Sequence, residues 1–279
     1  MISGQTLRLV CLILLSFQPG TETPLLIAAN RDEFYRRRAA QLDWWPGLDV
    51  LAGRDLGYAS PLLRLTNYLR LSESPNLGTW LGVNRAGKFA AITNYREPGK
   101  ENKNARSRGL LVSSFLESRM PAEVYAAELQ RSAGEYNGFN LLFGDTNAVC
   151  YFSNRGDGTA AKLAPGIYAL SNALLDTPWY KVRKIKSEFS RLRGPIRTEQ
   201  IFPIFADDTP APEGEVQQTG LSSAIEKGLS SPFIRLPGYG TRVTSVLQFR
   251  QNGEIEFCER TFRRGQPRGD QKYVFKVQR

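Results

Sequence analysis

Two short apolar runs separated by a polar turn open the chain, and they constrain its fold more than any other feature. The runs and the turn between them are 11–17 (CLILLSF), 24–29 (PLLIAA) and 18–23 (QPGTET). Runs of this length bounded by Pro and Gly are typical of β-strands in a hairpin. A turn centred on the Pro-Gly pair joins residues whose numbers sum to about 41, so Cys11 is expected opposite Asn30 or Arg31. The sequence thus predicts a thiol beside a polar cluster at 30–33 (NRDE).

Residues 7–17 (LRLVCLILLSF) also have the form of a weak secretion signal, with one basic residue before a short apolar stretch. No small-residue cleavage site follows, and a hairpin partner of matched length does, so the strand is favoured. Residues 1–10 are interpreted as an extension or a mis-assigned start. Val10 directly precedes Cys11, and a GTG valine codon can start translation in bacteria. Starting there and removing the initiator would leave Cys11 as the first residue.

Histidine is absent from all 279 residues. Its absence removes Ser-His-Asp and Cys-His catalysis, histidine metal sites and the usual general base at neutral pH. A nucleophile therefore needs another base. The α-amino group of an N-terminal cysteine, with a pKa of about 8, can take the proton from its own side chain.

The cysteine count and the charge balance narrow the class of protein. Cys11, Cys150 and Cys258 are widely spaced and odd in number, which indicates neither a disulfide framework nor a zinc site and favours a reducing, cytoplasmic location. The net charge is +10, with much of the excess in 181–197 and 260–279. No nucleic-acid motif accompanies these basic residues, so solvated faces are preferred over a nucleic-acid or membrane adaptor. No window reaches the roughly 18 apolar residues of a membrane span.

The remaining elements indicate a layered α+β protein. Strands are predicted at 50–54, 79–84, 89–93, 138–144, 148–153, 166–171, 242–249, 254–259 and 271–277. Helices are predicted at 108–118, 121–133 and 178–193, with a helical stretch broken by prolines at 198–230. Residues 35–46 are expected to be loop and 57–76 a surface insertion. With no repeat or clear linker, one domain over 1–279 is expected, and strands at both ends with helices between them fit a sandwich.

Eight sequence blocks, taken together, resemble the NRDE family, also called the transport and Golgi organisation family. The blocks are CLI at 11–13, ANRDEF at 29–34, LAGRD at 51–55, GTWLG at 78–82, TNYR at 93–96, YNGFNL at 136–141, LSNALL at 170–175 and YGTR at 239–242. They cover nearly the whole chain after residue 10. The resemblance implies the N-terminal-nucleophile hydrolase fold, a four-layer αββα sandwich. Its motif order is also similar to that of the choloylglycine hydrolase and penicillin V acylase group, whose members cleave non-peptide amide bonds with an N-terminal Cys.

The resemblance also implies site roles. It implies Cys11 as the nucleophile and Arg31, with Asp32, as the groups that orient it. It also implies Asn94 and Asn172 as oxyanion-hole asparagines and Arg242 as a late active-site arginine. The residue chemistry agrees, because a guanidinium near a thiol favours thiolate. An asparagine N–H that stabilises an oxyanion is worth about 3 kcal/mol in a comparable site. A carboxylate such as that of Asp32 can hold Arg31 bidentately.

The sequence departs from the family pattern at two places, and each candidate also has a structural interpretation. Family members begin Met-Cys, so if residues 1–10 persist the α-amine is absent. The segment 57–76 separates Asp55 from Gly78, and Leu77 replaces the first glycine of a Gly-Gly-Thr-Trp run. Cys11 can equally be a buried strand cysteine without a catalytic role. The 30–33 cluster can be a structural set of ion pairs that closes the hairpin, and Asn94 and Asn172 can be turn formers.

Two functions stay open at this point. The first is a cysteine N-terminal-nucleophile amidohydrolase or acyltransferase acting on a small non-peptide amide, with no cofactor. The second is a non-catalytic haem or lipid binding or trafficking protein on the same scaffold. For haem, the missing histidine leaves only Cys, Met or Tyr as axial ligand.

Overall fold

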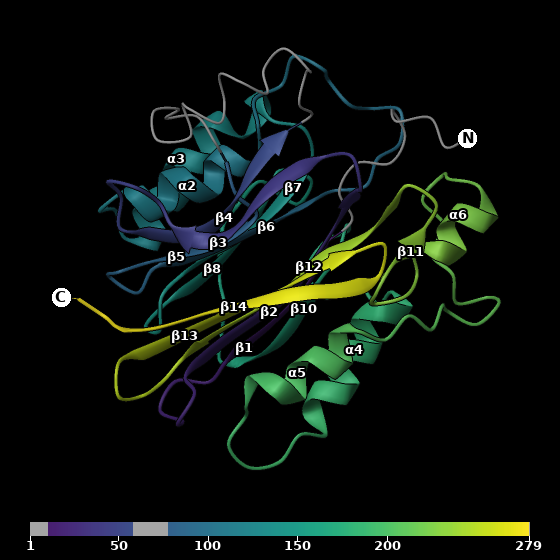
Figure 1. Ribbon diagram of the computed structural model, residues 1–279. Helices are drawn as coiled ribbons and strands as arrows, with labels where there is room; N and C mark the ends of the chain where they lie inside the picture. The colour runs from purple at the N-terminus through teal and green to yellow at the C-terminus, as the bar shows by residue number, and fades with distance from the viewer. Residues whose placement is uncertain (1–10, 58–77, 279) are drawn as a thin grey trace.

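Two antiparallel β-sheets packed face to face form the centre of the molecule, and helices cover both outer faces (Figure 1). In this computed structural model the described residues are 11–57 and 78–278. The first sheet has the strand order β10-β1-β2-β12-β13-β14, with β11 paired to β12, and the second runs from β3 to β9 in sequence order. The strands of the first sheet are β1 Cys11–Phe17, β2 Leu25–Phe34, β10 Gly166–Leu170, β11 Arg235–Leu236, β12 Tyr239–Phe249, β13 Glu254–Arg263 and β14 Gln266–Lys276. Those of the second are β3 Arg38–Trp44, β4 Val50–Gly57, β5 Leu81–Asn84, β6 Phe89–Asn94, β7 Phe139–Gly144, β8 Val149–Ser153 and β9 Ala161–Lys162.

Side chains on the first sheet alternate between two cores, as the strand period of two requires. Ile13 and Leu15 of β1 belong to the core between the sheets, whereas Leu12 and Leu14 belong to the core beneath the helices. Those helices are α4 (Tyr180–Ser190) and α5 (Thr198–Phe205). A short helix, α6 (Ser223–Gly228), lies beyond them near β11 (Figure 1). β1 is therefore buried on both faces, which explains its unbroken apolar sequence.

The outer face of the second sheet is covered by α2 (Gly109–Glu117) and α3 (Ala122–Ser132), which is followed by the one-turn 3₁₀ helix η1 (Ala133–Glu135). Phe115 of α2 packs on Phe143 of β7 with ring centroids 5.2 Å apart. Between the sheets, Phe89 of β6 meets Phe249 of β12 edge to face at 6.3 Å. The four-layer αββα sandwich expected from the family resemblance is confirmed.

The predicted elements agree with the structure except in two places. The hairpin register pairs Cys11 with Arg31, one of the two expected partners. The loop expected at 35–46 is wrong, because Arg38–Trp44 forms β3 against β4; two register shifts in that pairing explain why no clean alternation marks it. The helical stretch expected at 198–230 is largely wrong, since only α5 and α6 are helical there. Pro203 lies inside α5.

Two expectations lie outside the described residues. They are the extension at 1–10 and, beyond Gly57, the insertion at 57–76. Within the described part of the chain, every helix is too short or too polar to cross a membrane.

Candidate active site

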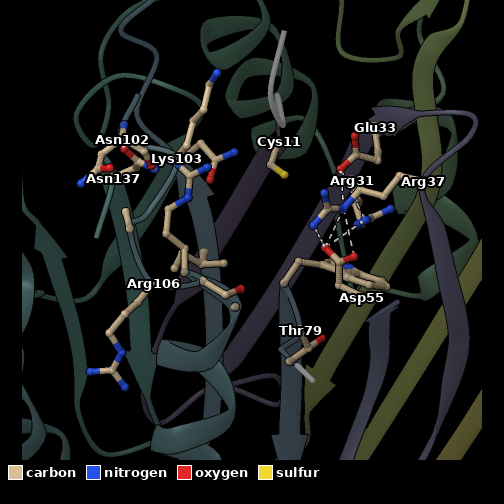
Figure 2. Close-up of a pocket in the computed structure, with 17 residues that line it drawn as sticks. Cys11, Arg31, Glu33, Arg37, Asp55, Thr79, Asn102, Lys103, Arg106 and Asn137 are labelled. Atoms are coloured by element: carbon tan, nitrogen blue, oxygen red, sulfur yellow. Dashed lines mark hydrogen bonds and ion pairs between the residues drawn. The ribbon is translucent and has the colours of Figure 1, made fainter. Parts of the chain in front are cut away.

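Cys11 lies at the start of β1, where this buried strand meets a cavity of about 240 Å³. The cysteine is 5% exposed and lines this cavity together with its strand partner Arg31 (Figure 2). On the other side of β1, Ser171 Oγ donates a hydrogen bond of 3.1 Å to the Cys11 carbonyl oxygen. Two neighbouring segments thus fix the backbone at the thiol.

The cavity is bounded by both sheets and by the loop that leads into α2. Its other lining residues are Glu33, Arg37, Asp55, Thr79, Trp80, Ile92, Asn94, Asn102, Lys103, Ala105–Gly109 and Asn137. A side chain on Gly78 would place its Cβ 2.5 Å from the backbone carbon of Gly109. The two glycines permit this close approach, which brings the first residue of α2 against the segment that precedes β5.

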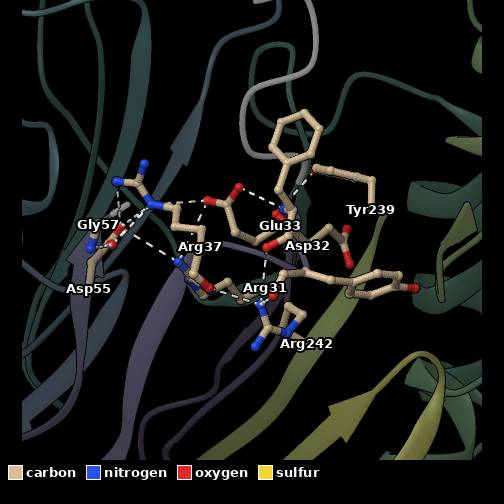
Figure 3. A network of polar contacts seen from close by, with 10 residues as sticks. Arg31, Asp32, Glu33, Arg37, Asp55, Gly57, Tyr239 and Arg242 are labelled. Atoms are coloured by element: carbon tan, nitrogen blue, oxygen red, sulfur yellow. Dashed lines mark hydrogen bonds and ion pairs between the residues drawn. The ribbon is translucent and has the colours of Figure 1, made fainter. Parts of the chain in front are cut away.

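The Arg31 guanidinium is 1% exposed and is held by two carboxylates and one ring. Its NH2 atom lies 3.6 Å from Glu33 and 3.5 Å from Asp55, and its guanidinium carbon lies 4.5 Å from the Trp80 ring centroid. Arg37 also binds Asp55, with contacts of 2.9 to 3.1 Å (Figure 3). Two cations and two anions thus balance at this part of the cavity wall, and Lys103, Arg106 and Arg108 add three cations to the rest of the lining.

Asp32 does not make the expected contact with Arg31, and that expectation is wrong. Successive side chains on a strand point to opposite faces, so Arg31 faces the cavity and Asp32 faces the helical layer. There Asp32 accepts a 2.5 Å hydrogen bond from Thr241 Oγ1. Its other oxygen, Oδ2, has no hydrogen-bond partner among the described residues. Burial raises the pKa of Asp32, and the charge of Lys181 and the Thr241 hydrogen bond oppose that rise.

The Cys11 thiol is held in its protonated form by its surroundings. Burial raises its pKa to about 12, and the negative charge of Asp32 adds to the rise. The Arg31 guanidinium and the backbone N–H of Asp32 act in the opposite direction and lower the pKa. Nucleophilic attack by this thiol therefore requires a group that accepts its proton.

The two predicted asparagines are joined but occupy different positions. Asn94, at the end of β6, lines the cavity. Asn172 lies behind it, and its Nδ2 donates 2.8 Å to the Asn94 carbonyl oxygen while its Oδ1 accepts from Ser171. Asn94 is thus the asparagine placed to meet a bound group, and Asn172 fixes the strand end that carries it.

Arg242 lies in a bulge of β12 and does not line the cavity. Its NH1 atom donates to the carbonyl oxygens of Phe34, Tyr35 and Arg37 at 3.0 to 3.3 Å (Figure 3). These bonds brace the turn after β2, from which Arg37 reaches the cavity. In this arrangement Arg242 holds the backbone that carries Arg37 and does not itself reach the cavity.

Three residues around Arg31 were given no separate role from the sequence: Glu33 was expected only as part of the polar cluster at 30–33, and Asp55 and Trp80 were outside the predicted site. All three stand inside blocks that carry the family resemblance, which was the available signal. The structure gives each a physical task, because together they surround the buried Arg31 guanidinium.

Comparison with known proteins places the chain. The sequence pattern of the family described as Transport and Golgi organisation 2 matches residues 10–264. The chain belongs to this family. The Transport and Golgi organization protein 2 homolog of Bos taurus is 36% identical over 272 residues, which covers 90% of this chain and 93% of the relative. The Homo sapiens homolog is 32% identical over 276 residues, with the same coverage.

Two solved structures align with this chain at much lower sequence identity than these relatives. The Caenorhabditis elegans N-acylethanolamine-hydrolyzing acid amidase ortholog aligns with a TM-score of 0.46 and 9% identity, covering 85% of this chain and 92% of that one. A mutant of the conjugated bile acid hydrolase from Clostridium perfringens aligns with a TM-score of 0.41 and 11% identity, covering 96% and 97%.

Proposed function

We propose that this Transport and Golgi organisation 2 family member is a cysteine-nucleophile amidohydrolase or acyltransferase that acts on a small non-peptide amide. The observation that carries the proposal is the position of Cys11. The thiol stands at the start of a strand that is buried on both faces, opens onto a cavity and is paired across the ladder with a buried arginine. Catalytic groups held on strands buried in a core are positioned more accurately than groups on loops.

The cavity supports a small substrate. Its volume of about 240 Å³ lies below the roughly 300–1,000 Å³ of pockets for drug-sized ligands. Arg31 and Asn94 line it beside the thiol, and both carry N–H groups that can meet an oxygen with developing negative charge. The balanced Arg31, Arg37, Glu33 and Asp55 set keeps the guanidinium of Arg31 in a fixed orientation.

The reaction proceeds by acyl transfer. Cys11 Sγ attacks the amide carbonyl carbon, and the carbon–sulfur bond forms as the electron pair of the C=O bond moves to oxygen. Collapse of this intermediate breaks the C–N bond, and the amine leaves with the proton that came from the thiol. Water or an acceptor amine then releases the acyl group from the thioester.

The proposal includes a mature chain that begins at Cys11, so that the α-amine serves as base. The family pattern matches from residue 10, immediately before Cys11, which supports this start. The nucleophile must also stay reduced. All three cysteines are free and buried, which supports a reducing compartment such as the cytoplasm.

The test compares Cys11→Ala with Cys150→Ala, a second buried cysteine remote from the cavity, on a panel of small N-acyl amines. Removing a nucleophile from a catalytic unit costs on the order of 10⁶ in turnover, so a loss of at least about a thousandfold is expected for Cys11→Ala alone. Mass spectrometry of the native N-terminus accompanies the assay. Equal turnover in Cys11→Ala and the parent would overturn the proposal.

A second candidate function is a binding or trafficking protein that holds haem or lipid without catalysis. The high pKa of the buried Cys11 thiol favours it, because a protonated thiol is a poor nucleophile. The lipid version of this candidate predicts that Cys11→Ala keeps full ligand binding. A haem titration without a shift of the Soret band counts against its haem version.

A further inference from the structure

One side of the Cys11 cavity is formed by residues of the polar loop 102–108 and by Asn137. Figure 2 shows this side to the left of Cys11 and the Arg31 ion pairs to its right. The proposed acyl transfer uses no side chain of this loop. The loop is therefore available to recognise another part of a substrate.

The loop is fixed at both ends by one block of the family pattern, YNGFNL at 136–141. The backbone N–H of Asn102 donates to Asn137 Oδ1 at 2.7 Å, and Asn137 Nδ2 donates to the Asn102 carbonyl oxygen at 2.9 Å. At the other end of the loop, Arg108 NH1 donates to the Gly138 carbonyl oxygen at 2.9 Å. The block thus holds the loop at a defined position beside the cavity.

The cavity lining carries more positive than negative charge. Five of its residues are Arg or Lys, and two are Asp or Glu. Both carboxylates, Glu33 and Asp55, are joined to Arg31 and Arg37, so the remaining cations all come from the loop. The same side includes Gly109, where α2 begins with a partial positive charge and no acidic residue in its first turn. A cavity with this balance attracts anions.

Lys103 is the cation of the loop that is placed to meet a ligand. It stands at the tip of a turn that is closed by hydrogen bonds from two following backbone N–H groups to Asn102. Arg106 is occupied by Glu135, with which it forms an ion pair of 2.7 Å. Lys103 itself is exposed and, within the part of the chain that the structure describes, pairs with no carboxylate. Its ammonium can therefore bind an anion without first breaking an ion pair.

We propose that the substrate is a small amide that carries an anionic group, a carboxylate or a phosphate, and that Lys103 binds this group while the amide carbonyl lies at Cys11. Both residues line one cavity of about 240 Å³, so one small molecule can contact both. Lys103 is then a specificity residue that selects the substrate and takes no part in bond breaking. The amide rests on the proposed function, whereas the binding of the anion does not.

The test measures binding to the full-length Cys11→Ala chain, which lacks the nucleophile. Isothermal titration calorimetry compares N-butyrylglycine, an anion, with its neutral counterpart N-butyrylglycinamide. The anion should bind more tightly, and raising NaCl from about 50 to about 500 mM should reduce this preference, because salt screens exposed charges. Two further anions, N-butylsuccinamate and the phosphate ester of N-butyrylethanolamine, show whether the charge is preferred on the acyl side and whether phosphate is preferred to carboxylate.

Lys103→Gln is compared in the same background with Lys100→Gln, which removes an exposed lysine of the same segment that does not line the cavity. Lys103→Gln should weaken the binding of the anions by about two- to fivefold, as expected for an exposed ion pair, and leave that of the neutral probe unchanged. Lys100→Gln should leave both unchanged.

Equal affinity for the anionic and neutral probes overturns the inference, as does a Lys103→Gln chain that loses no more affinity than Lys100→Gln. Because binding is measured without turnover, these outcomes are separate from the turnover test of Cys11→Ala.

Discussion

The two faces of β2 bury polar side chains in different ways, by ion pairs on one face and by hydrogen bonds on the other. On the cavity face, Arg31 and Glu33 are joined to Arg37 and Asp55 in a closed set of ion pairs. On the helical face, Asn30 and Asp32 are held mainly by hydrogen bonds from hydroxyl groups. Thr244 donates to Asn30 at 2.6 Å, and Thr241 donates to Asp32 at 2.5 Å.

Both faces leave buried polar atoms without a hydrogen-bond partner among the described residues: Arg31 NH1 and NH2 and Glu33 Oε2 on the cavity face, and Asp32 Oδ2 on the helical face. Asn30 is fully used, because its Nδ2 also donates to the carbonyl oxygens of Phe205 and Pro232. Within the described residues, Asp32 Oδ2 and Lys181 Nζ have no hydrogen-bond partner, and the charge of Lys181 acts on Asp32. The faces differ instead in how charge is balanced: ion pairs at 2.9 to 3.6 Å join the charges on the cavity face, whereas on the helical face burial raises the pKa of Asp32 and lowers that of Lys181.

Asp55→Asn tests the cavity face and should have the largest effect on stability. It removes the carboxylate shared by Arg31 and Arg37 and leaves the buried Arg31 with Glu33 alone. Breaking one side of a buried ion-pair set costs roughly 3 kcal/mol in the free energy of unfolding. Urea unfolding at pH 7.5 measures the loss.

Asp32→Asn is the matched control on the other face. It keeps an oxygen that accepts from Thr241 and removes a charge that burial disfavours, so a change under about 1 kcal/mol is expected. If Asp32→Asn destabilised the protein as much as Asp55→Asn, the contrast between the faces would be refuted.

Glu259→Gln tests a buried carboxyl between the two sheets that has no ion pair among the described residues. Glu259 accepts from the backbone N–H of Leu42 and from Ser245, and burial raises its pKa to about 7. Its protonated form stabilises the folded state fully below about pH 4.5, and this contribution is lost as the pH rises through 7. At pH 8 the free energy of unfolding of Glu259→Gln should therefore exceed that of the parent by at most about 3 kcal/mol. At pH 4 the two free energies should be nearly equal.

The same urea unfolding curves can also contradict this prediction for Glu259→Gln. Parent and Glu259→Gln curves that keep a constant separation from pH 4 to pH 8 would mean that Glu259 titrates normally. A missing ion pair would then not explain how Glu259 differs from the ion-paired carboxyls of Glu33 and Asp55.

Much of the fold was predictable from local pattern. The Pro-Gly turn between two apolar runs fixed the partner of Cys11 to within one residue, and the stripe of Val182, Ile185 and Phe189 located α4. β3 was missed because its pairing with β4 shifts register twice, which removes the alternation that marks a strand.

The candidate site was predictable only in part, because its contacts are long-range. The strand period alone indicates that Arg31 and Asp32 face opposite ways and that Arg31 and Glu33 share a face, yet Asp55 and Trp80 come from β4 and the segment before β5, which no local pattern joins to Arg31. Lys181 carried a signal that was available but unused. A lysine four residues before Ile185 on an apolar stripe is expected to be buried.

The most direct test of the central claim is to look for an acyl group on Cys11. The folded chain is incubated with a small p-nitrophenyl ester, quenched in acid and digested, and each cysteine peptide is weighed. The account predicts a hydroxylamine-sensitive acyl adduct on the Cys11 peptide and none on the peptides of Cys150 and Cys258. A Cys11 peptide that stays unmodified, while the ester acylates other side chains of the same protein, would contradict it.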